Sequence, residues 1–139
     1  MDAATCRRLF ASSLRAALAT SGLRGPHIVP IVFAVDENRL YTAIDQKPKT
    51  TNRLQRLKNI ERDPAVAVLA DRYADDWASL WWVRADGVAS TVTDSETRAH
   101  GLDLLAAKYP AYRDQRPHGA LIAIDVTSWK GWSAAGAAS

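Results

Sequence analysis

The segment that decides the fold is HIVPIVFAVDENRLYTAI, residues His27 to Ile44. Its first half is apolar and β-branched, which is typical of a strand, and the polar residues Asp36 to Asn38 follow as a short loop. RLYTAI then supplies the return strand of an antiparallel hairpin. Pro30 has no amide donor, so we expect it at a sheet edge, a bulge or a position that faces a ligand.

The rest of the chain adds strands on the C-terminal side of this hairpin and a helix on its N-terminal side. The pattern favours the α+β class, with five or six antiparallel strands curled into a small barrel and about three helices. We expect one domain over residues 1–139, with a flexible tail at 133–139. The further predicted elements are a helix at Ala3–Ala19, a turn at Ser21–Pro26, strands at Pro64–Ala70, Ser79–Val92 (with a bulge or bend at Gly87) and Ala120–Trp129, a helix from Asp94 or Ser95 to Tyr109, and a loop over residues 110–119.

Composition narrows the class of protein. The chain has 139 residues, of which 47% are hydrophobic and 24% charged, as in an ordinary globular domain. A single cysteine, Cys6, excludes a disulfide within the chain, and His27, His100 and His118 are too scattered to predict a metal site. We see neither a signal-peptide pattern nor an apolar run of about 20 residues, so we expect a cytoplasmic protein that does not enter a membrane.

A basic segment gives the main indication of function. KPKTTNRLQRLK, from Lys47 to Lys58, carries five basic residues and no acid between two predicted strands. Lys49, Arg53 and Arg56 have the spacing of one helix face, and guanidinium groups, ammonium groups and helix-start amides all suit a phosphate. Because the charge is local, a small anionic ligand is favoured over nucleic acid. A solvated surface helix is the alternative interpretation.

The chain contains five tryptophans: Trp77, Trp81, Trp82, Trp129 and Trp132. Adjacent Trp81 and Trp82 point to opposite faces of a strand, so that one fills a core while the other faces a partner subunit or a planar ligand. A small RNA-binding barrel with stacking tryptophans therefore stays open, and it predicts steeply salt-dependent binding of RNA.

Five segments, in chain order, resemble a known family. They are PHIVPIVFAV, LYTAIDQKPK, RLKNIERDPAVAVL, DWASLWWVRADGVA and SWKGW. Together they resemble the pyridoxamine 5′-phosphate oxidase-like split β-barrel proteins, and within them the actinobacterial branch that binds the deazaflavin coenzyme F420. The resemblance implies a six-stranded antiparallel split β-barrel with flanking helices, which forms a homodimer with cofactor sites at its interface. Relatives usually carry a strand after the first helix, so residues Leu14 to Thr20 have a strand as their alternative assignment.

The resemblance also implies which residues bind the cofactor. The segment from Pro30 would back the deazaflavin ring, the strand from Tyr41 to Ile44 would line it, and the basic segment would hold the phosphate or the glutamyl tail. Arg56 stands where the family often has a lysine, which keeps the charge and changes its geometry. The implied cofactor-binding residues are Pro30, Ile31, Val32, Thr42, Ile44, Lys47, Lys49, Thr50, Thr51, Arg56, Lys58 and Asn59, with Trp77 and Trp81 closing the site from the other subunit.

The activity implied by the resemblance is hydride transfer between reduced F420 and an unsaturated organic small molecule. The chemistry would reside in the cofactor, which agrees with the lack of a nucleophile motif such as GxSxG in the sequence. His27, Tyr41 or water would supply any proton. Two alternatives remain open: an FMN-dependent oxidase or reductase of the same fold, and a non-catalytic carrier of F420.

Overall fold

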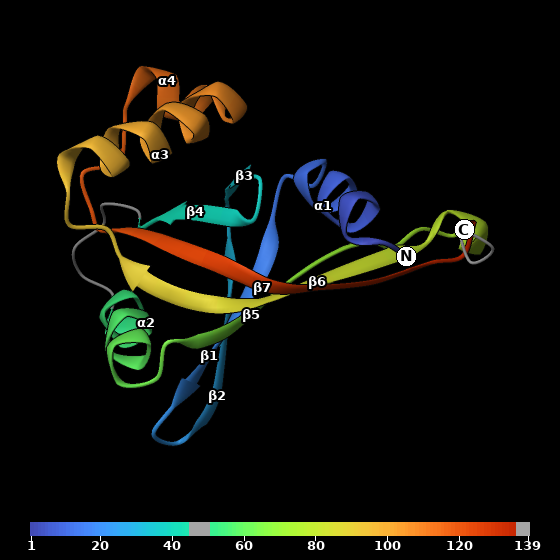
Figure 1. Cartoon of the computed structure of the whole chain (residues 1–139), viewed down its shortest axis with the longest axis horizontal. Helices are drawn as coiled ribbons and strands as arrows, with labels where there is room; N and C mark the ends of the chain where they lie inside the picture. Colours follow the sequence, from blue (N-terminus) through green and yellow to red (C-terminus); the bar gives the residue numbers. More distant parts are fainter. Residues whose placement is uncertain (45–50, 136–139) are drawn as a thin grey trace.

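The computed structural model describes residues 1–44 and 51–135, and side chains for 1–44 and 55–135. In these ranges the chain forms one antiparallel sheet flanked by helices (Figure 1). The helices are α1 (Ala3–Ala11), α2 (Thr51–Arg62), α3 (Ser95–Lys108) and α4 (Pro110–Asp114), with a 3₁₀ turn η1 (Trp77–Ser79). The strands are β1 (Ala16–Gly22), β2 (Gly25–Ile31), β3 (Ala34–Asp36), β4 (Arg39–Ala43), β5 (Ala65–Arg72), β6 (Trp81–Thr91) and β7 (Leu121–Ser133).

The sheet has the strand order β2-β1-β5-β6-β7-β4-β3, which confirms the α+β class and the antiparallel pairing. The expectation of six strands in a barrel was wrong in detail, because the described sheet has seven strands and two edges. The predicted strand at His27–Val35 is divided: the chain leaves β2 at Val32 and starts β3 at Ala34 on the opposite edge. Three Cα steps span at most about 11 Å, so the sheet must curl strongly to bring its two edges this close.

The N-terminal segment corrects the predicted helix at Ala3–Ala19. Helix α1 ends at Ala11, and the following residues form β1, close to the alternative strand assignment. Ala16, Leu18 and Thr20 are buried while their neighbours are more exposed, which is the period-two pattern of a strand. Pairing with β2 and β5 on either side outweighs the helix preference of the alanines.

Several local signals are confirmed. Pro30 lies in β2, an edge strand, and the register of β6 and β7 shifts between Asp86 and Gly87. A side chain at Gly87 would place its Cβ 2.5 Å from the Asp125 carbonyl oxygen, so the bulge requires glycine. Asp94 caps α3, because its Oδ2 accepts a hydrogen bond of 2.9 Å from the Thr97 amide.

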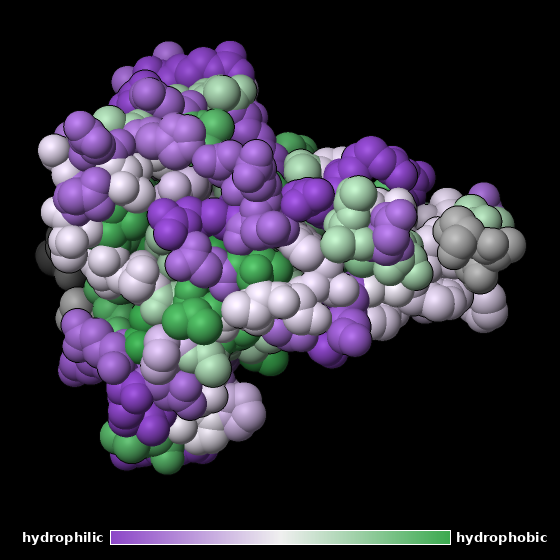
Figure 2. Space-filling view, viewed as in Figure 1, coloured by the Kyte–Doolittle hydropathy of each residue, from purple (hydrophilic) through white to green (hydrophobic). Residues whose placement is uncertain are grey.

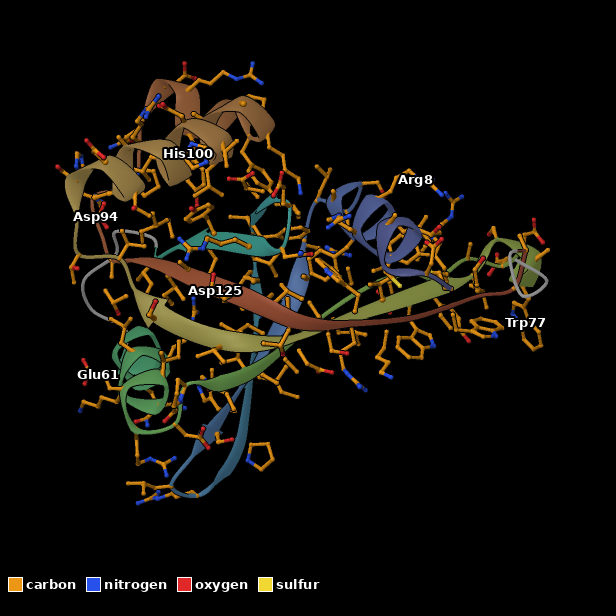
Figure 3. All side chains as sticks on the ribbon, in the orientation of Figure 1. Arg8, Glu61, Trp77, Asp94, His100 and Asp125 are labelled. Atoms are coloured by element: carbon orange, nitrogen blue, oxygen red, sulfur yellow. The ribbon has the colours of Figure 1, made fainter. Side chains whose placement is uncertain are left out.

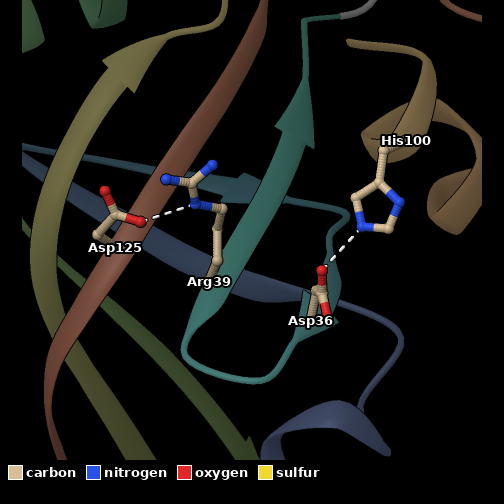
Figure 4. Close-up of polar contacts among 4 residues, drawn as sticks. All are labelled: Asp36, Arg39, His100 and Asp125. Atoms are coloured by element: carbon tan, nitrogen blue, oxygen red, sulfur yellow. Dashed lines mark hydrogen bonds and ion pairs between the residues drawn. The ribbon is translucent and has the colours of Figure 1, made fainter. Parts of the chain in front are cut away.

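Helix α3 covers the end of the sheet formed by β3 and β4. Gly101 allows close approach, because a Cβ there would lie 2.8 Å from Leu121 and from the Tyr41 ring. The helix is also tied by a hydrogen bond of 2.8 Å between His100 Nε2 and Asp36 Oδ2 (Figure 4). Nearby, Arg39 and Asp125 join β4 to β7 through an ion pair of 2.7 Å (Figure 4).

The two faces of the sheet differ in what covers them. A main core of α1 and the strands includes Phe10, Leu18, Phe33 and Val83, and a second core lies under α3. On the side shown in Figure 2, apolar surface gathers between the mainly hydrophilic surfaces of α3–α4 and of α2.

Within the described ranges, no helix combines the length and the apolar character needed to cross a bilayer.

Candidate functional site

A cleft of about 270 Å³ lies where β2, β4, α2 and α4 meet. These elements come from four separate parts of the chain, and in Figure 1 all four lie in the half of the molecule away from the β5–β6 connection. The fold therefore brings five of the predicted cofactor-binding residues together. The cleft is lined by the predicted residues Pro30, Ile31, Val32, Thr42 and Arg56, and by Ala43 and Tyr112.

The wall of the cleft is formed by the bend between β2 and β3, whose backbone is held by side chains. Thr42 Oγ1 donates to the Val32 carbonyl at 2.7 Å. The Tyr109 hydroxyl accepts from the Phe33 amide at 3.1 Å and lies 2.8 Å from the Leu14 carbonyl and 3.1 Å from the Phe33 carbonyl. These contacts satisfy polar groups that the sheet leaves unpaired, so the wall has a defined shape. Burial raises the pKa of Tyr109, which keeps its hydroxyl protonated.

Arg56 supplies the charge of the cleft. It is partly buried, and among the described lining residues it alone has a formal charge. A guanidinium beside an apolar wall suits a phosphate attached to a planar group. The helix that carries it begins at Thr51, directly after the predicted phosphate-binding residues Lys47, Lys49 and Thr50, which lie outside the described residues, as does the side chain of Thr51.

Other predicted binding residues of this region lie elsewhere. Asn59 is buried, accepts from Gln55 Nε2 at 2.8 Å and donates to Thr20 Oγ1 at 3.0 Å, so it anchors α2 to β1. Lys58 is exposed on the surface of α2. Ile44 belongs to the main core, and its amide donates to the Ala120 carbonyl. None of these three lines the described cleft.

The two candidate proton donors are not brought into the cleft. Tyr41 is only 2% exposed and packs under α3, with its ring centroid 5.9 Å from that of His100. His27 lies on β2 but lines a different cavity, toward the β1–β2 turn. Neither side chain lines the described cleft, so any proton donor there must be another group or water.

Trp77 and Trp81 lie far from this cleft in the same chain. Trp77, in η1, is 72% exposed and lies at the opposite end of the molecule from α2 (Figure 3). Trp81 is partly buried against the main core and lines an apolar surface with Trp82 and Trp132. Their predicted role in closing the site from a partner subunit stays a prediction.

Tyr112 is a lining residue that the sequence did not predict. It lies on α4, inside the segment 110–119 that we expected to be a loop. The signal was present, because Pro110 suits the first helical position and Tyr109 and Tyr112 have helical spacing. Their ring centroids lie 5.9 Å apart, which links the wall of the cleft to its α4 side.

A half-buried lysine, Lys108, lies behind the wall, with its Nζ atom buried. Lys108 Nζ is 3.7 Å from the centroid of the Phe33 ring and has no hydrogen-bond partner among the described residues. Burial lowers the pKa of Lys108 to about 8.

In the described ranges, no three His, Cys, Asp or Glu side chains are grouped to hold a metal ion. The cleft thus offers binding groups, an apolar wall and a cation.

The family of the chain is shown by comparison with known proteins. The family model of pyridoxamine 5′-phosphate oxidase matches residues 3–133, nearly the whole chain. The chain belongs to the pyridoxamine 5′-phosphate oxidase family. This family generally contains oxidoreductases, and membership agrees with the resemblance found in the sequence.

Solved structures share the fold at low sequence identity. A conserved hypothetical protein from Mycobacterium tuberculosis has a TM-score of 0.78 and 23% identity, covering 96% of this chain and 86% of its own. A FAD-binding protein from Mesorhizobium loti has a TM-score of 0.72 and 17% identity, covering 94% of both chains. The FAD-binding protein from Mycobacterium smegmatis has a TM-score of 0.66 and 20% identity, and the match covers 95% of this chain and 94% of that protein. No curated protein matches the chain.

Proposed function

We propose that the protein binds coenzyme F420 in the cleft around Arg56 and uses it to reduce an unsaturated organic small molecule. The observation that carries this proposal is the meeting of Arg56 with the Pro30–Val32 wall in one cleft of a pyridoxamine 5′-phosphate oxidase family member. The chemistry that F420 supplies when bound is hydride transfer. The protein contributes binding, orientation and exclusion of water.

The donor set of the cleft fits such a cofactor. Ile31 and Val32 offer an apolar surface for a planar ring, and Thr42 holds the Val32 carbonyl in a fixed position. Arg56 offers a cation for the phosphate. It lies in the second turn of α2, a helix whose start at Thr51 has backbone amides that suit an anion. The basic residues of the 47–49 segment would add to this charge.

The second candidate is FMN in the same cleft. Two relatives of the same fold are described as FAD-binding, which supports a flavin as the ring bound here. FMN has the same need for a ring surface and a phosphate-binding cation, so the described cleft residues suit both cofactors. The resemblance of the sequence to the F420-binding branch is what favours F420.

The protein is also proposed to act as a homodimer. The sheet exposes large apolar side chains on one face: Ile28, Leu69, Trp82, Val88 and Trp132. Strand alternation and register place them on the same side, and an apolar face of this kind marks an interaction surface. A second copy would cover the face and bring Trp77 and Trp81 toward the partner's cleft. Sedimentation equilibrium tests this: a monomer at all concentrations up to about 100 µM would contradict it.

The role of Arg56 is tested with Arg56→Gln and a matched control, Arg8→Gln, on the exposed surface of α1 (Figure 3). Losing one charged contact to a phosphate costs about 1.5–3 kcal/mol, so F420 affinity should fall about tenfold to a hundredfold in Arg56→Gln. The control should bind as the wild type does. Equal affinity in all three proteins would remove Arg56 from the site.

Turnover separates an enzyme from a carrier. Reduced F420 is mixed with the protein and a panel of conjugated carbonyl compounds and quinones, and its oxidation is followed by absorbance. Protein-dependent oxidation with at least one substrate supports the reductase. Tight binding of F420 without oxidation across the panel would support the carrier.

A further inference from the structure

A second cavity, of about 390 Å³, lies between the β1–β2 turn and α2. It is separate from the cleft around Arg56 but shares two elements with it. Strand β2 lines this cavity with Gly25, Pro26 and His27 and lines the cleft with Pro30 and Ile31. Helix α2 lines the cavity with Gln55 and Asn59 and lines the cleft with Arg56. His27 and Pro30 are three residues apart on a strand, a distance of about 10 Å.

His27 gives this cavity an unsatisfied polar atom. Its Nδ1 is buried and has no hydrogen-bond partner among the described residues. A buried polar atom without a partner is costly, and structures usually satisfy such atoms with protein, water or ligand. Because His27 faces the cavity, a ligand placed there can supply the missing partner.

The other polar lining groups favour a carboxylate. Arg24 is the one charged residue among the described lining residues, and no acid lines the cavity with it. The side-chain amides of Gln55 and Asn59 are held in place by the hydrogen bond between them and by the bond from Asn59 to Thr20. Each amide group has two N–H donors, so each retains one that these bonds do not use. A cation and fixed neutral donors around a small cavity are the groups that bind a carboxylate.

We propose that this cavity is a carboxylate-binding site, with His27 and Arg24 as the residues that contact the ligand. Two sources of the carboxylate fit the chemistry: a free carboxylic acid, such as a substrate, and the glutamyl tail of F420 bound in the neighbouring cleft. The second source rests on the proposed function. It accounts for a polar cavity placed about 10 Å along β2 from the cofactor cleft.

The test has two arms. In the first, binding of F420 with its glutamyl tail is compared with binding of the tailless form, in the wild type and in His27→Phe, Arg24→Gln and the control Arg8→Gln. If the tail occupies the cavity, it should improve affinity about tenfold in the wild type and in the control. Both cavity variants should lose this gain while binding the tailless form with unchanged affinity.

In the second arm, γ-linked diglutamate alone is titrated into the wild type, and the imidazole resonances of His27 are followed by NMR. A saturable shift that Arg24→Gln weakens supports the carboxylate site even if F420 does not bind at all. A shift without any tail effect on F420 affinity assigns the site to a free carboxylic acid. If the tail has no effect and diglutamate leaves the His27 resonances unchanged, the proposal is wrong. Because Arg24 is exposed, Arg24→Gln keeps the test valid if His27→Phe fails to fold.

Discussion

Removing the Tyr109 hydroxyl should destabilise the wall of the cleft around Arg56. In Tyr109→Phe the Phe33 amide loses its acceptor, at 3.1 Å, and the Leu14 carbonyl loses its donor, at 2.8 Å. Phe33 is fully buried, so water cannot easily replace the lost acceptor, whereas Leu14 is 67% exposed and its carbonyl can bind water. The Phe33 carbonyl lies 3.1 Å from the same hydroxyl, so the penalty is set mainly by the buried backbone of Phe33.

A buried donor left without a partner costs about 1–3 kcal/mol, and we expect Tyr109→Phe to lower the free energy of unfolding by about 2 kcal/mol. For a domain of this size, about 3 °C in Tm corresponds to each kcal/mol, so Tm should fall by about 6 °C. Because this wall lines the cleft proposed to bind F420, affinity for F420 should fall as well.

The assay is urea unfolding followed by tryptophan fluorescence, at one fixed protein concentration. The control is Tyr73→Phe, whose hydroxyl lies on a side chain that is 80% exposed, and it should change stability by less than about 0.5 kcal/mol. If Tyr109→Phe and the control unfold at the same urea concentration with the same slope, the Tyr109 hydroxyl does not stabilise the wall.

Three further changes have distinct expected results. Burial lowers the pKa of Lys108 to about 8, below its ordinary value of 10.5, so the folded state binds fewer protons and stability should rise as pH increases from about 8 to 10.5. Lys108→Met should remove this rise and increase the free energy of unfolding at pH 7 by about 1–2 kcal/mol, a figure already reduced because Lys108 is partly exposed to solvent. Thermal unfolding at several pH values measures both effects. Gly87→Ala should lower the free energy of unfolding by about 1–3 kcal/mol, because the new Cβ would lie 2.5 Å from the Asp125 carbonyl oxygen; urea unfolding measures this loss. Asp36→Asn should cost less than about 1 kcal/mol, since its bond to His100 is half-exposed, and hydrogen exchange in α3 should report the loss.

For each of these three variants, one outcome would contradict the expected result. A Lys108→Met protein that keeps the wild-type dependence of stability on pH would show that another group titrates. An unchanged Gly87→Ala protein would mean that β7 moves aside at no cost. For Asp36→Asn, a loss of several kcal/mol would show that the contact with His100 has a larger role than its exposure indicates.

Much of the fold could be predicted from local patterns in the sequence. The break at Asp36 to Asn38, the edge position of Pro30, the bulge at Gly87 and the Asp94 cap each follow from one residue's backbone or side-chain chemistry. The first strand was harder, because alanine-rich residues 16–19 favour a helix on their own and form a strand only when β2 and β5 pair with them.

The site was predictable only in part. Pro30 to Val32, Thr42 and Arg56 were named from the family resemblance, and they meet in one cleft. Pro110 indicates the helix that carries Tyr112, but no local pattern indicates how Tyr109 and Tyr112 pack against the sheet, because these are long-range contacts. The role of Asn59 could not be inferred either, since its burial arises from contact with Thr20, 39 residues earlier in the chain.

The proposed function requires the cleft around Arg56 to bind F420 in preference to FMN. The most direct measurement is a fluorescence titration of the purified, cofactor-free protein with each compound at the same salt concentration. We predict saturable binding of F420 at least about tenfold tighter than binding of FMN, a difference of about 1.4 kcal/mol. Micromolar binding of FMN with no response to F420 would overturn the proposed F420 site.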